Sequence, residues 1–273
     1  MNQNIKLLLA CDLDGTVLPN GSAPLSPDAL EIFSQLASKE AVLLAYISGR
    51  SLQHALKGMK EFDAPLPDIY VGDVGTSIYH FNNDEFEMDL DWRKEISTEW
   101  NDIAKKEIMT ALIEIPNLIE QESEYQNDYK ISFYFPIDKE SLISSTVKEK
   151  LTDFGIKATV VTLVDEKTGY LDIIPENATK EHALGYLQTR LGLTKDAIIY
   201  SGDGGNDLAP LTSGYNSIVV NNASQAFKAK VAREAKKRGT FEKIYFAKGN
   251  YNGMNGNYVA GILEGLNFFR KII

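Results

Sequence analysis

The chain has 273 residues, of which 44% are hydrophobic, and its 38 acidic and 28 basic residues give a formal net charge of −10. This charge argues against an extended nucleic-acid surface, because it repels phosphate backbones. No run approaches the roughly 20 apolar residues that span a bilayer, and the first four residues do not resemble a signal peptide, so we expect a cytoplasmic protein with no membrane partner. The single cysteine, Cys11, cannot form an internal disulfide.

The first predicted element is a buried strand from Ile5 to Cys11 that ends in Asp12-Leu13-Asp14-Gly15-Thr16. Alternation along a strand would aim Asp12 and Asp14 to one side. Two carboxylates so near each other repel, so we expect a cation beside them. Mg²⁺ prefers oxygen ligands of this kind. An ordinary Asp- and Gly-rich turn is the alternative, and this stretch alone does not decide between the two.

Helices and apolar strands then alternate. Ser26 and Pro27 predict the start of a helix, with Ser26 as its N-cap. The next strand is a near-continuous apolar run, typical of a parallel sheet covered on both faces, and it ends in Ser48-Gly49-Arg50. Ser48 can offer its hydroxyl or backbone N–H to a phosphate, or cap the following helix. The predicted ranges are helix 26–39, strand 41–47, helix 52–62, strand 68–72 and a further strand from 75.

From about residue 83 the composition changes: acidic residues become dense and both tryptophans appear. The ranges predicted here are helix 91–112, strand 129–135, helix 139–154 and strand 158–164. This order favours a small α+β layer over an antiparallel sheet. We therefore expect an inserted domain at 83–168, between core segments 1–82 and 169–273.

The pattern of a parallel sheet returns after the insertion, with a strand expected at 170–175. Thr179 is the predicted N-cap of a helix whose first turn holds Lys180, where a cation opposes the helix dipole. This unfavourable position is weak evidence that Lys180 has a functional role, and a solvated surface lysine is the commoner explanation for a lysine in the first turn of a helix. The next strand runs into Gly202-Asp203-Gly204-Gly205-Asn206-Asp207, whose glycines let the backbone approach a metal or an anion; a surface loop is the alternative. The remaining ranges are strand 197–201, strand 217–220, helix 224–237, strand 243–246 and helix 256–269.

Four strand or strand–helix junctions thus carry polar groups: the Asp12 and Asp14 pair, Ser48, Lys180 and the loop from Asp203 to Asp207. Because the carboxyl ends of parallel strands share one edge of a sheet, these groups can converge. Phosphoryl transfer needs its oxygens neutralised by a metal, a lysine and hydrogen-bond donors, and an aspartate can be the nucleophile. The set therefore predicts a phosphoryl-transfer centre.

These motifs, in this order and with an insertion between the second and the third, resemble the haloacid dehalogenase (HAD) superfamily of phosphatases over essentially the whole chain. The resemblance implies an HAD-like, Rossmann-like fold of the α/β class: a doubly wound parallel sheet core with an inserted α+β C2 cap. It implies Asp12 as nucleophile and Asp14 as general acid and then base. It also implies Ser48 and Lys180 as phosphate binders in the catalytic set. The metal implied is Mg²⁺, held by Asp12, the Asp14 carbonyl and Asp203, with Asp207 and Asn206 in support.

Within the C2-cap class, segments 44–51, 75–79, 129–132 and 260–264 look like those of the sucrose-phosphate phosphatase branch. Gly15 and Ser48 depart from that branch, whose plant and cyanobacterial members usually carry Asn or His at the first position and in many cases Thr at the second. Both residues are common in general Cof-type members. The resemblance implies a Mg²⁺-dependent phosphatase acting on a sugar phosphate, above all a disaccharide phosphate such as sucrose 6F-phosphate, through an aspartyl-phosphate.

Other functions stay open at this point. One is a broad Cof-type hydrolase or phosphomutase acting on monosaccharide or cofactor phosphates, and another is a degenerate domain that binds sugar phosphates without turning them over. The cap is expected to choose the leaving group. Lys130 is the candidate for sugar hydroxyls, with Asp91 as another, and Arg50 is a candidate for the far end of the substrate, with a structural salt bridge as its alternative.

Aromatic residues of the insertion can also offer a face to a sugar ring, although core packing is the usual role of large rings. These residues are Trp92, Trp100, Tyr129 and Tyr134. The expected partner is therefore a small sugar phosphate, and the expected assembly is a monomer or a weak homodimer.

Overall fold

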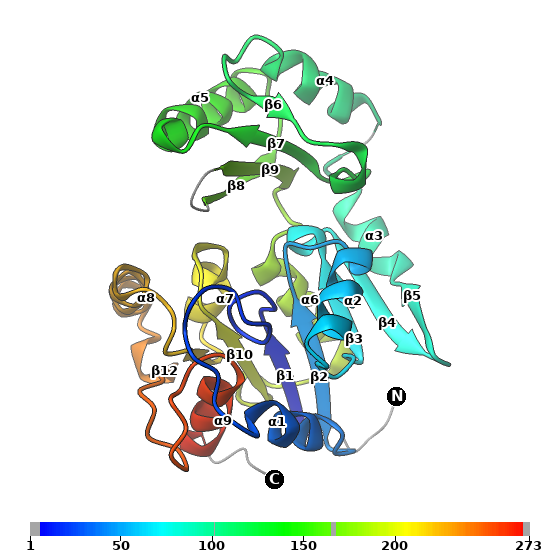
Figure 1. Cartoon of the computed structure of the whole chain (residues 1–273). Coiled ribbons are helices and arrows are strands. Elements are labelled where there is room, and N and C mark those ends of the chain that lie inside the picture. Colours follow the sequence, from blue (N-terminus) through cyan, green and yellow to red (C-terminus); the bar gives the residue numbers. More distant parts are fainter. Residues whose placement is uncertain (1–5, 101, 165–167, 270–273) are drawn as a thin grey trace.

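The computed structural model describes residues 6–100, 102–164 and 168–269. The chain forms two lobes, each built around its own sheet (Figure 1). Residues 1–4, on which the expectation about a signal peptide rests, lie outside the described part. Within that part, no helix is both long and apolar enough to cross a membrane.

The larger lobe contains an eight-stranded sheet in the order β12-β11-β10-β1-β2-β3-β4-β5. The strands from β12 to β3 are parallel, and β4 and β5 extend the sheet in antiparallel fashion. This arrangement confirms the predicted doubly wound parallel sheet. The strands are β1 (Leu7–Cys11), β2 (Val42–Ile47), β3 (Ile69–Gly72), β4 (Ser77–Asn82), β5 (Glu85–Met88), β10 (Ile198–Gly202), β11 (Asn216–Val219) and β12 (Ile244–Phe246).

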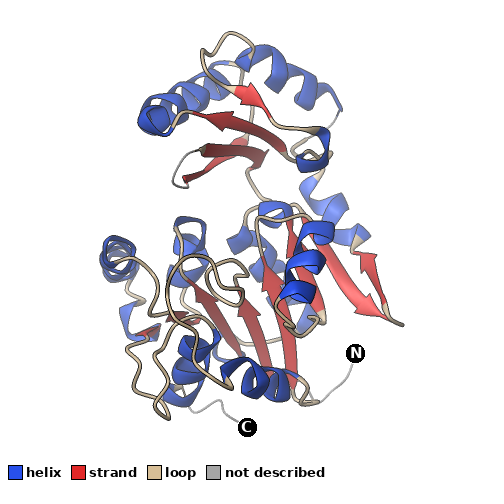
Figure 2. Cartoon of the chain, in the orientation of Figure 1, coloured by secondary structure: helices blue, strands red, loops and turns tan. Residues whose placement is uncertain are grey.

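Helices cover both faces of this sheet (Figure 2), and β1 shows why. Its alternate residues enter different cores: Leu7 and Leu9 pack on one face, Leu8 and Ala10 on the other. A strand buried on both sides has no place for a charge until it ends, so Asp12 emerges at its carboxyl end. One face is covered by α1 (Ala29–Ala37), α2 (Leu52–Glu61) and α9 (Val259–Phe268), the other by α3 (Leu90–Ile96), α6 (Lys180–Leu191), α7 (Leu208–Thr212) and α8 (Gln225–Arg238).

The smaller lobe is a cap built on an antiparallel sheet in the order β6-β7-β9-β8. Its helices lie on the side of the sheet away from the larger lobe (Figure 1), so the sheet itself faces the core. Trp100, Phe133, Val147 and Leu171 belong to a hydrophobic cluster of its own. The elements are α4 (Asp102–Leu112), β6 (Ile119–Glu120), β7 (Ile131–Phe135), α5 (Glu140–Asp153), β8 (Ala158–Val164) and β9 (Gly169–Pro175).

One predicted strand lies in the other sheet from the one expected, and one strand that was not predicted extends the core sheet. The strand predicted at 170–175 to rejoin the parallel core is β9, which pairs antiparallel with both β7 and β8 in the cap. Because β9 is a central strand of the cap sheet, its sequence is as apolar as that of a strand in the core. Residues 85–88 form β5, which pairs with β4 across Asn83 and Asp84, both at positive φ, as a two-residue hairpin requires. We propose that the cap runs from about residue 97 to about residue 176.

Helix starts agree with the sequence only in part. Thr179 caps α6 as predicted, accepting the His182 N–H at 3.4 Å. The prediction for Ser26 was wrong: α1 begins at Ala29, and the Ser26 hydroxyl instead accepts the N–H of Asn255 at 2.9 Å. The helix predicted at 91–112 is two helices, α3 and α4, and residue 101 between them lies outside the described part.

Candidate active site

The two carboxylates that follow β1 have different surroundings. Asp12 is 5% exposed, and its backbone N–H donates to the Ser201 carbonyl at 2.8 Å, which ties it to the neighbouring strand. The Asp14 side chain is 30% exposed and forms a two-point ion pair with Arg50, whose Nε and Nη2 donate to Oδ2 and Oδ1 at 2.7 and 2.5 Å. One carboxylate is therefore enclosed, and the other lies at the mouth of the site.

Lys180 is enclosed together with Asp12. Its Nζ lies 2.5 Å from Oδ1 of Asp12 and 2.8 Å from Oδ1 of Asp207, and the side chain is 2% exposed. Burial alone lowers the pKa of Lys180, but the charges of Asp12 and Asp207 outweigh it and raise the pKa above the ordinary value. Lys180 is thus a permanent cation at the N-terminus of α6, which accounts for the unfavourable placement noted in the sequence.

Asp207 anchors the glycine-rich loop after β10. Its Oδ1 accepts Lys180 and the Tyr200 hydroxyl, the latter at 2.7 Å. Its Oδ2 accepts the backbone N–H groups of Asp203 and Gly204 at 3.2 and 3.1 Å. Four donors on one fully buried carboxylate fix the loop and direct Asp203 toward β1.

Asp12, Asp203 and Asp207 form the acidic cluster of the site, each with an oxygen within 4.8 Å of an oxygen of the other two. Burial, followed by the charge of Asp207, raises the pKa of Asp12 well above its usual range. The same two causes raise the pKa of Asp203 to about 7. A hard divalent cation would relieve this repulsion, and an all-oxygen donor set is the kind that Mg²⁺ takes. Because Asp207 already accepts four hydrogen bonds, Asp12 and Asp203 have the freer oxygens.

Two residues that the sequence analysis did not assign a role hold the loop after Asp14 against this cluster. The Thr16 hydroxyl donates to Oδ1 of Asp203 at 3.0 Å. The Asn222 amide donates to the carbonyl of Gly15 at 2.6 Å. Thr16 stood within the first motif, and Asn222 follows the end of a parallel strand, so the argument from strand ends could have found both.

Gly15 itself is required by the geometry. Its φ is +80°, and a Cβ at this position would lie 2.4 Å from Oδ2 of Asp203. A left-handed backbone and a close approach both demand glycine. The Asp203 carboxylate therefore packs directly against the loop that follows Asp12.

Ser48 is nearly inaccessible at the carboxyl end of β2, the strand beside β1. Its N–H donates to the Val71 carbonyl at 2.8 Å, so the expectation that this N–H could bind phosphate was wrong. The hydroxyl oxygen accepts the Arg50 N–H at 3.1 Å. The Tyr70 hydroxyl is a second hydrogen-bond partner of the same side chain.

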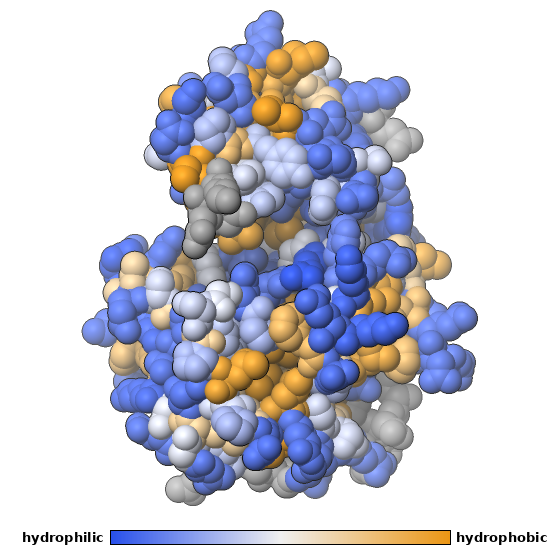
Figure 3. All heavy atoms as spheres, viewed as in Figure 1, coloured by the Kyte–Doolittle hydropathy of each residue, from blue (hydrophilic) through white to orange (hydrophobic). Residues whose placement is uncertain are grey.

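A cavity of about 660 Å³ lies between the two lobes. Asp12, Asp14, Arg50, Asp203 and Asn206 line it from the core. In the space-filling view (Figure 3) the lobes are separated by a hollow with mostly hydrophilic residues on either side. Asp12 and Asp203 thus lie on the core side of a chamber that is open to solvent and has the cap on its other side.

The residues named from the sequence within the predicted insertion divide into two groups. Lys130 is buried, lines the cavity and forms an ion pair with Asp73 of the core at 3.5 Å. Tyr134 also lines the cavity. Asp91 is instead paired with Arg190 at 2.8 Å and is not among the residues around the cavity.

The tryptophans pack in hydrophobic cores, Trp92 in the larger lobe and Trp100 in the cap. Tyr129 packs against both of these cores. The aromatic side chains that accompany Tyr134 around the cavity are Tyr125 and Tyr170, which the sequence did not single out. Nothing in the local pattern distinguished them, because each lies in a short stretch of the cap whose position became clear only with the second sheet.

The fold and the site together define a phosphatase of the HAD superfamily: a doubly wound core, an aspartate pair after β1, a serine after β2, a lysine at the start of α6 and an aspartate loop after β10. The family described as sucrose-6F-phosphate phosphohydrolase matches residues 5–270, and the chain belongs to it.

Relatives and solved structures agree with this assignment. An HAD-like hydrolase of Nitrosococcus oceani is 40% identical over 97% of this chain and 72% of its own. A mannosylfructose-phosphate phosphatase of Agrobacterium fabrum is 28% identical over 79% of this chain and 83% of its own, and sucrose-phosphatase 1 of tobacco (Nicotiana tabacum) is 29% identical over 79% of this chain and half of its own. The fold is that of the sucrose-phosphatase of Synechocystis sp. PCC6803, solved with sucrose and phosphate: TM-score 0.80, 24% identity, 97% and 98% of the two chains. The chain is thus a phosphoric monoester hydrolase.

Proposed function

We propose that this phosphatase is Mg²⁺-dependent and removes phosphate from a disaccharide phosphate such as sucrose 6F-phosphate through an aspartyl-phosphate on Asp12. The observation that carries the proposal is the chamber between the lobes, which has Asp12, with Lys180 bonded to it, and Asp203 at one end and cap residues at the other. Its volume lies within the range of about 300–1,000 Å³ typical of sites for ligands of this size.

The residues fit the metal. Asp12, Asp203 and the Asp14 backbone carbonyl would hold Mg²⁺, with Asp207 keeping the loop in place. When bound, the ion neutralises part of the charge on the phosphoryl oxygens.

The protein's own groups account for the rest of the reaction. Lys180 presents a cation to the phosphate, and its charge opposes the rise in the pKa of Asp12 and so favours the ionised nucleophile. The Ser48 hydroxyl donates to another phosphate oxygen. Asp14 gives a proton to the leaving sugar oxygen and then takes one from the attacking water. Because Arg50 engages both oxygens of Asp14, at least one of those hydrogen bonds must be released when Asp14 acts.

The sugar would lie in the upper part of the chamber. Lys130 supplies a charged donor for hydroxyl groups there, and Tyr125, Tyr134 and Tyr170 supply rings of the kind that pack against sugars. Asn206 lies on the core side of the same chamber. Two of the relatives bear names that refer to phosphates of disaccharides, sucrose and mannosylfructose, which supports a two-ring substrate.

A broader hydrolase of monosaccharide phosphates is the second candidate. A relative in Bacillus subtilis, 23% identical, is named kanosamine-6-phosphate phosphatase, whose substrate has one ring. The chamber would admit one ring as well as two.

A phosphate-release assay over a panel of sugar phosphates tests the proposal. We expect kcat/KM to be at least about tenfold higher for disaccharide phosphates than for hexose phosphates, since the second ring adds contacts with the cap. Equal rates on both classes would favour the broader hydrolase. Dialysis against a chelator should abolish activity, and added Mg²⁺ should restore it.

A further inference from the structure

The turn that follows β3 has an unusual backbone. Asp73 and Val74 both have positive φ, +53° and +65°, although neither is glycine. A left-handed conformation is a genuine outlier for a β-branched residue such as Val74. Such strain persists only where the surroundings enforce it, and it is typical of functional sites.

The surroundings that enforce it are the loop of the phosphate site. The Asp73 N–H donates to the Arg50 carbonyl at 2.9 Å, and the Val74 N–H donates to the Ser48 carbonyl at 3.1 Å. These two hydrogen bonds fix the loop on which the Ser48 hydroxyl is placed. A movement of the turn would therefore move the Ser48 loop.

The next residue of the turn meets the helix that carries Lys180. Gly75, at φ +117°, packs so closely that a Cβ would lie 2.4 Å from the carbonyl oxygen of Ala178 and 2.9 Å from the backbone nitrogen of Lys180. The turn thus contacts two parts of the core that bind phosphate in the proposed mechanism.

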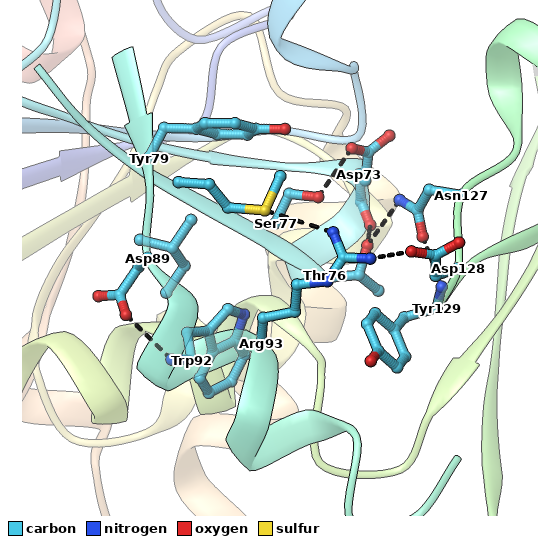
Figure 4. A pocket seen from close by; sticks show the side chains of 12 residues that line it. Asp73, Thr76, Ser77, Tyr79, Asp89, Trp92, Arg93, Asn127, Asp128 and Tyr129 are labelled. Carbon is cyan, nitrogen blue, oxygen red and sulfur yellow. Dashed lines mark hydrogen bonds and ion pairs between the residues drawn. The ribbon is translucent and has the colours of Figure 1, made fainter. Parts of the chain in front are cut away.

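The Asp73 carboxylate links this turn to the cap. One oxygen accepts the Ser77 hydroxyl at 3.1 Å within the core (Figure 4), and the other lies 3.5 Å from Nζ of Lys130 in the cap. Both partners of this ion pair are at most 10% exposed, so it is screened far less than a surface pair. A second contact lies beside it, where the Asn127 amide donates to the Thr76 hydroxyl at 3.1 Å (Figure 4).

We infer that Asp73 is a positioning residue that couples the seating of the cap to the phosphate site. With Lys130 against Asp73, the strained turn holds the Ser48 loop and the start of α6 in the arrangement that binds phosphate. Without that ion pair the cap no longer holds the turn against the Ser48 loop, the hydrogen bonds from Asp73 and Val74 to that loop loosen, and phosphate binding weakens although neither Asp73 nor Lys130 contacts phosphate. The inference rests on the proposed phosphate-binding roles of Ser48 and Lys180.

Inorganic phosphate tests the coupling, because it has no sugar to contact the cap. Its affinity for the full chain with Mg²⁺ present is measured by calorimetry, which needs no turnover. We expect Asp73→Asn, which keeps a residue tolerant of the left-handed region, to raise the Kd about fivefold, and Lys130→Met to raise it similarly. The double variant should bind phosphate no more weakly than either single one, since both changes break the same link.

Arg93→Gln is the matched control. Arg93 forms an ion pair with Asp128 of the cap (Figure 4), and its other recorded side-chain partners are Met88 and the ring of Tyr129 rather than residues 73–75. This variant should bind phosphate like the wild type. If all the single variants weaken binding equally, the effect is general loosening of the cap and the inference is wrong.

Two further results would overturn the coupling, one of them together with the proposed phosphate site. An unchanged phosphate Kd in Asp73→Asn and Lys130→Met, with only the KM for a sugar phosphate raised, would mean that both residues contact the sugar directly and would overturn the coupling alone. A wild type that does not bind phosphate would overturn the proposed phosphate site together with it. Thermal unfolding of each variant checks that the fold is intact.

Discussion

Lys180 and Asp12 lie 168 positions apart in the chain, yet their side chains meet at 2.5 Å inside the protein. The ion pair joins the end of β1 to the start of α6, across the whole inserted cap. Asp207 completes it from a third element, at 2.8 Å from the same ammonium group. One cation thus balances two buried carboxylates, so the proposed nucleophile, phosphate binder and metal loop depend on each other.

Replacing Lys180 with methionine should therefore affect both activity and stability. We expect kcat/KM to fall by at least about 100-fold, because the phosphate loses a charged partner. Without Mg²⁺, the free energy of unfolding should fall by about 3 kcal/mol, because two buried carboxylates lose their counter-ion. Phosphate release and urea unfolding measure the two effects. Lys195→Met, at an exposed lysine that bonds the Ser213 carbonyl, should change activity little.

Asp203→Asn separates metal binding from folding. Removing one charge from the acidic cluster should leave the metal-free protein as stable as the wild type or more stable, because burial and the charge of Asp207 raise the pKa of Asp203 to about 7. The rise in Tm on adding Mg²⁺ should be largely lost, since that rise reflects binding to the native state alone. Thermal unfolding over a series of Mg²⁺ concentrations gives both quantities. A variant that gains as much Tm from Mg²⁺ as the wild type would show that Asp203 is no ligand.

Gly15→Ala should weaken Mg²⁺ binding by displacing the Asp203 carboxylate, which a new Cβ would approach to 2.4 Å. Gly21→Ala is the control, because Gly21 also has a positive φ, +109°, but has open space around it. Both changes carry the backbone strain of about 1 kcal/mol, and only the first touches the site. Calorimetric titration with Mg²⁺ should therefore separate them. Equal Mg²⁺ affinities would contradict the packing of Gly15 on Asp203.

Asp89 gives the protein a specific acid sensitivity. Burial alone raises the pKa of Asp89, but hydrogen bonds from His80, the Trp92 N–H and Tyr186 outweigh it and bring the pKa below the ordinary value. A carboxylate with a lowered pKa in the folded state adds stability above the unfolded value of about 3.9, and this stability disappears as the pH falls through the folded value.

Asp89→Ala should therefore cost about 1 kcal/mol at pH 7, also because the α3 N-cap is lost. Urea unfolding of both proteins at decreasing pH measures this difference, which should shrink below about pH 4. Asp91→Asn, at an exposed residue of the same helix, should have little effect. A cost for Asp89→Ala that stays constant over the whole pH range would rule out the carboxylate charge as its source.

The core and its site could be predicted from the sequence for a physical reason. A strand buried on both faces is continuously apolar, so its end is marked by the first polar residue, and parallel strands bring those ends together. Asp12, Ser48 and Asp203 follow β1, β2 and β10 in this way. The conflict of Lys180 with the helix dipole was only weak evidence for a role, which the family resemblance then implied; its two carboxylate partners in the structure resolve that conflict.

The boundaries of the cap could not be found in the same way. The central strand of the cap, β9, is buried like a core strand, so local composition could not assign it to a sheet. The contacts between the two lobes could not be predicted either, because the pairing of Lys130 with Asp73 depends on how the sheets face each other.

Arg50 was predicted to contact the far end of the substrate, with a structural salt bridge as the alternative. The salt bridge is present in the structure, with Asp14 as the partner of Arg50. The role of Arg50 toward the substrate stays a prediction.

The central claim is that the reaction passes through an aspartyl-phosphate on Asp12. Its most direct test compares the wild-type protein with the Asp12→Asn variant during a single turnover of a disaccharide phosphate with Mg²⁺ present. In the wild type, acid quenching followed by mass spectrometry of the digested protein should find a phosphoryl group on the peptide that contains Asp12. The variant should form no such adduct, release no phosphate and keep the unfolding transition of a folded protein. Near-normal turnover by Asp12→Asn would contradict an aspartyl-phosphate mechanism at this residue.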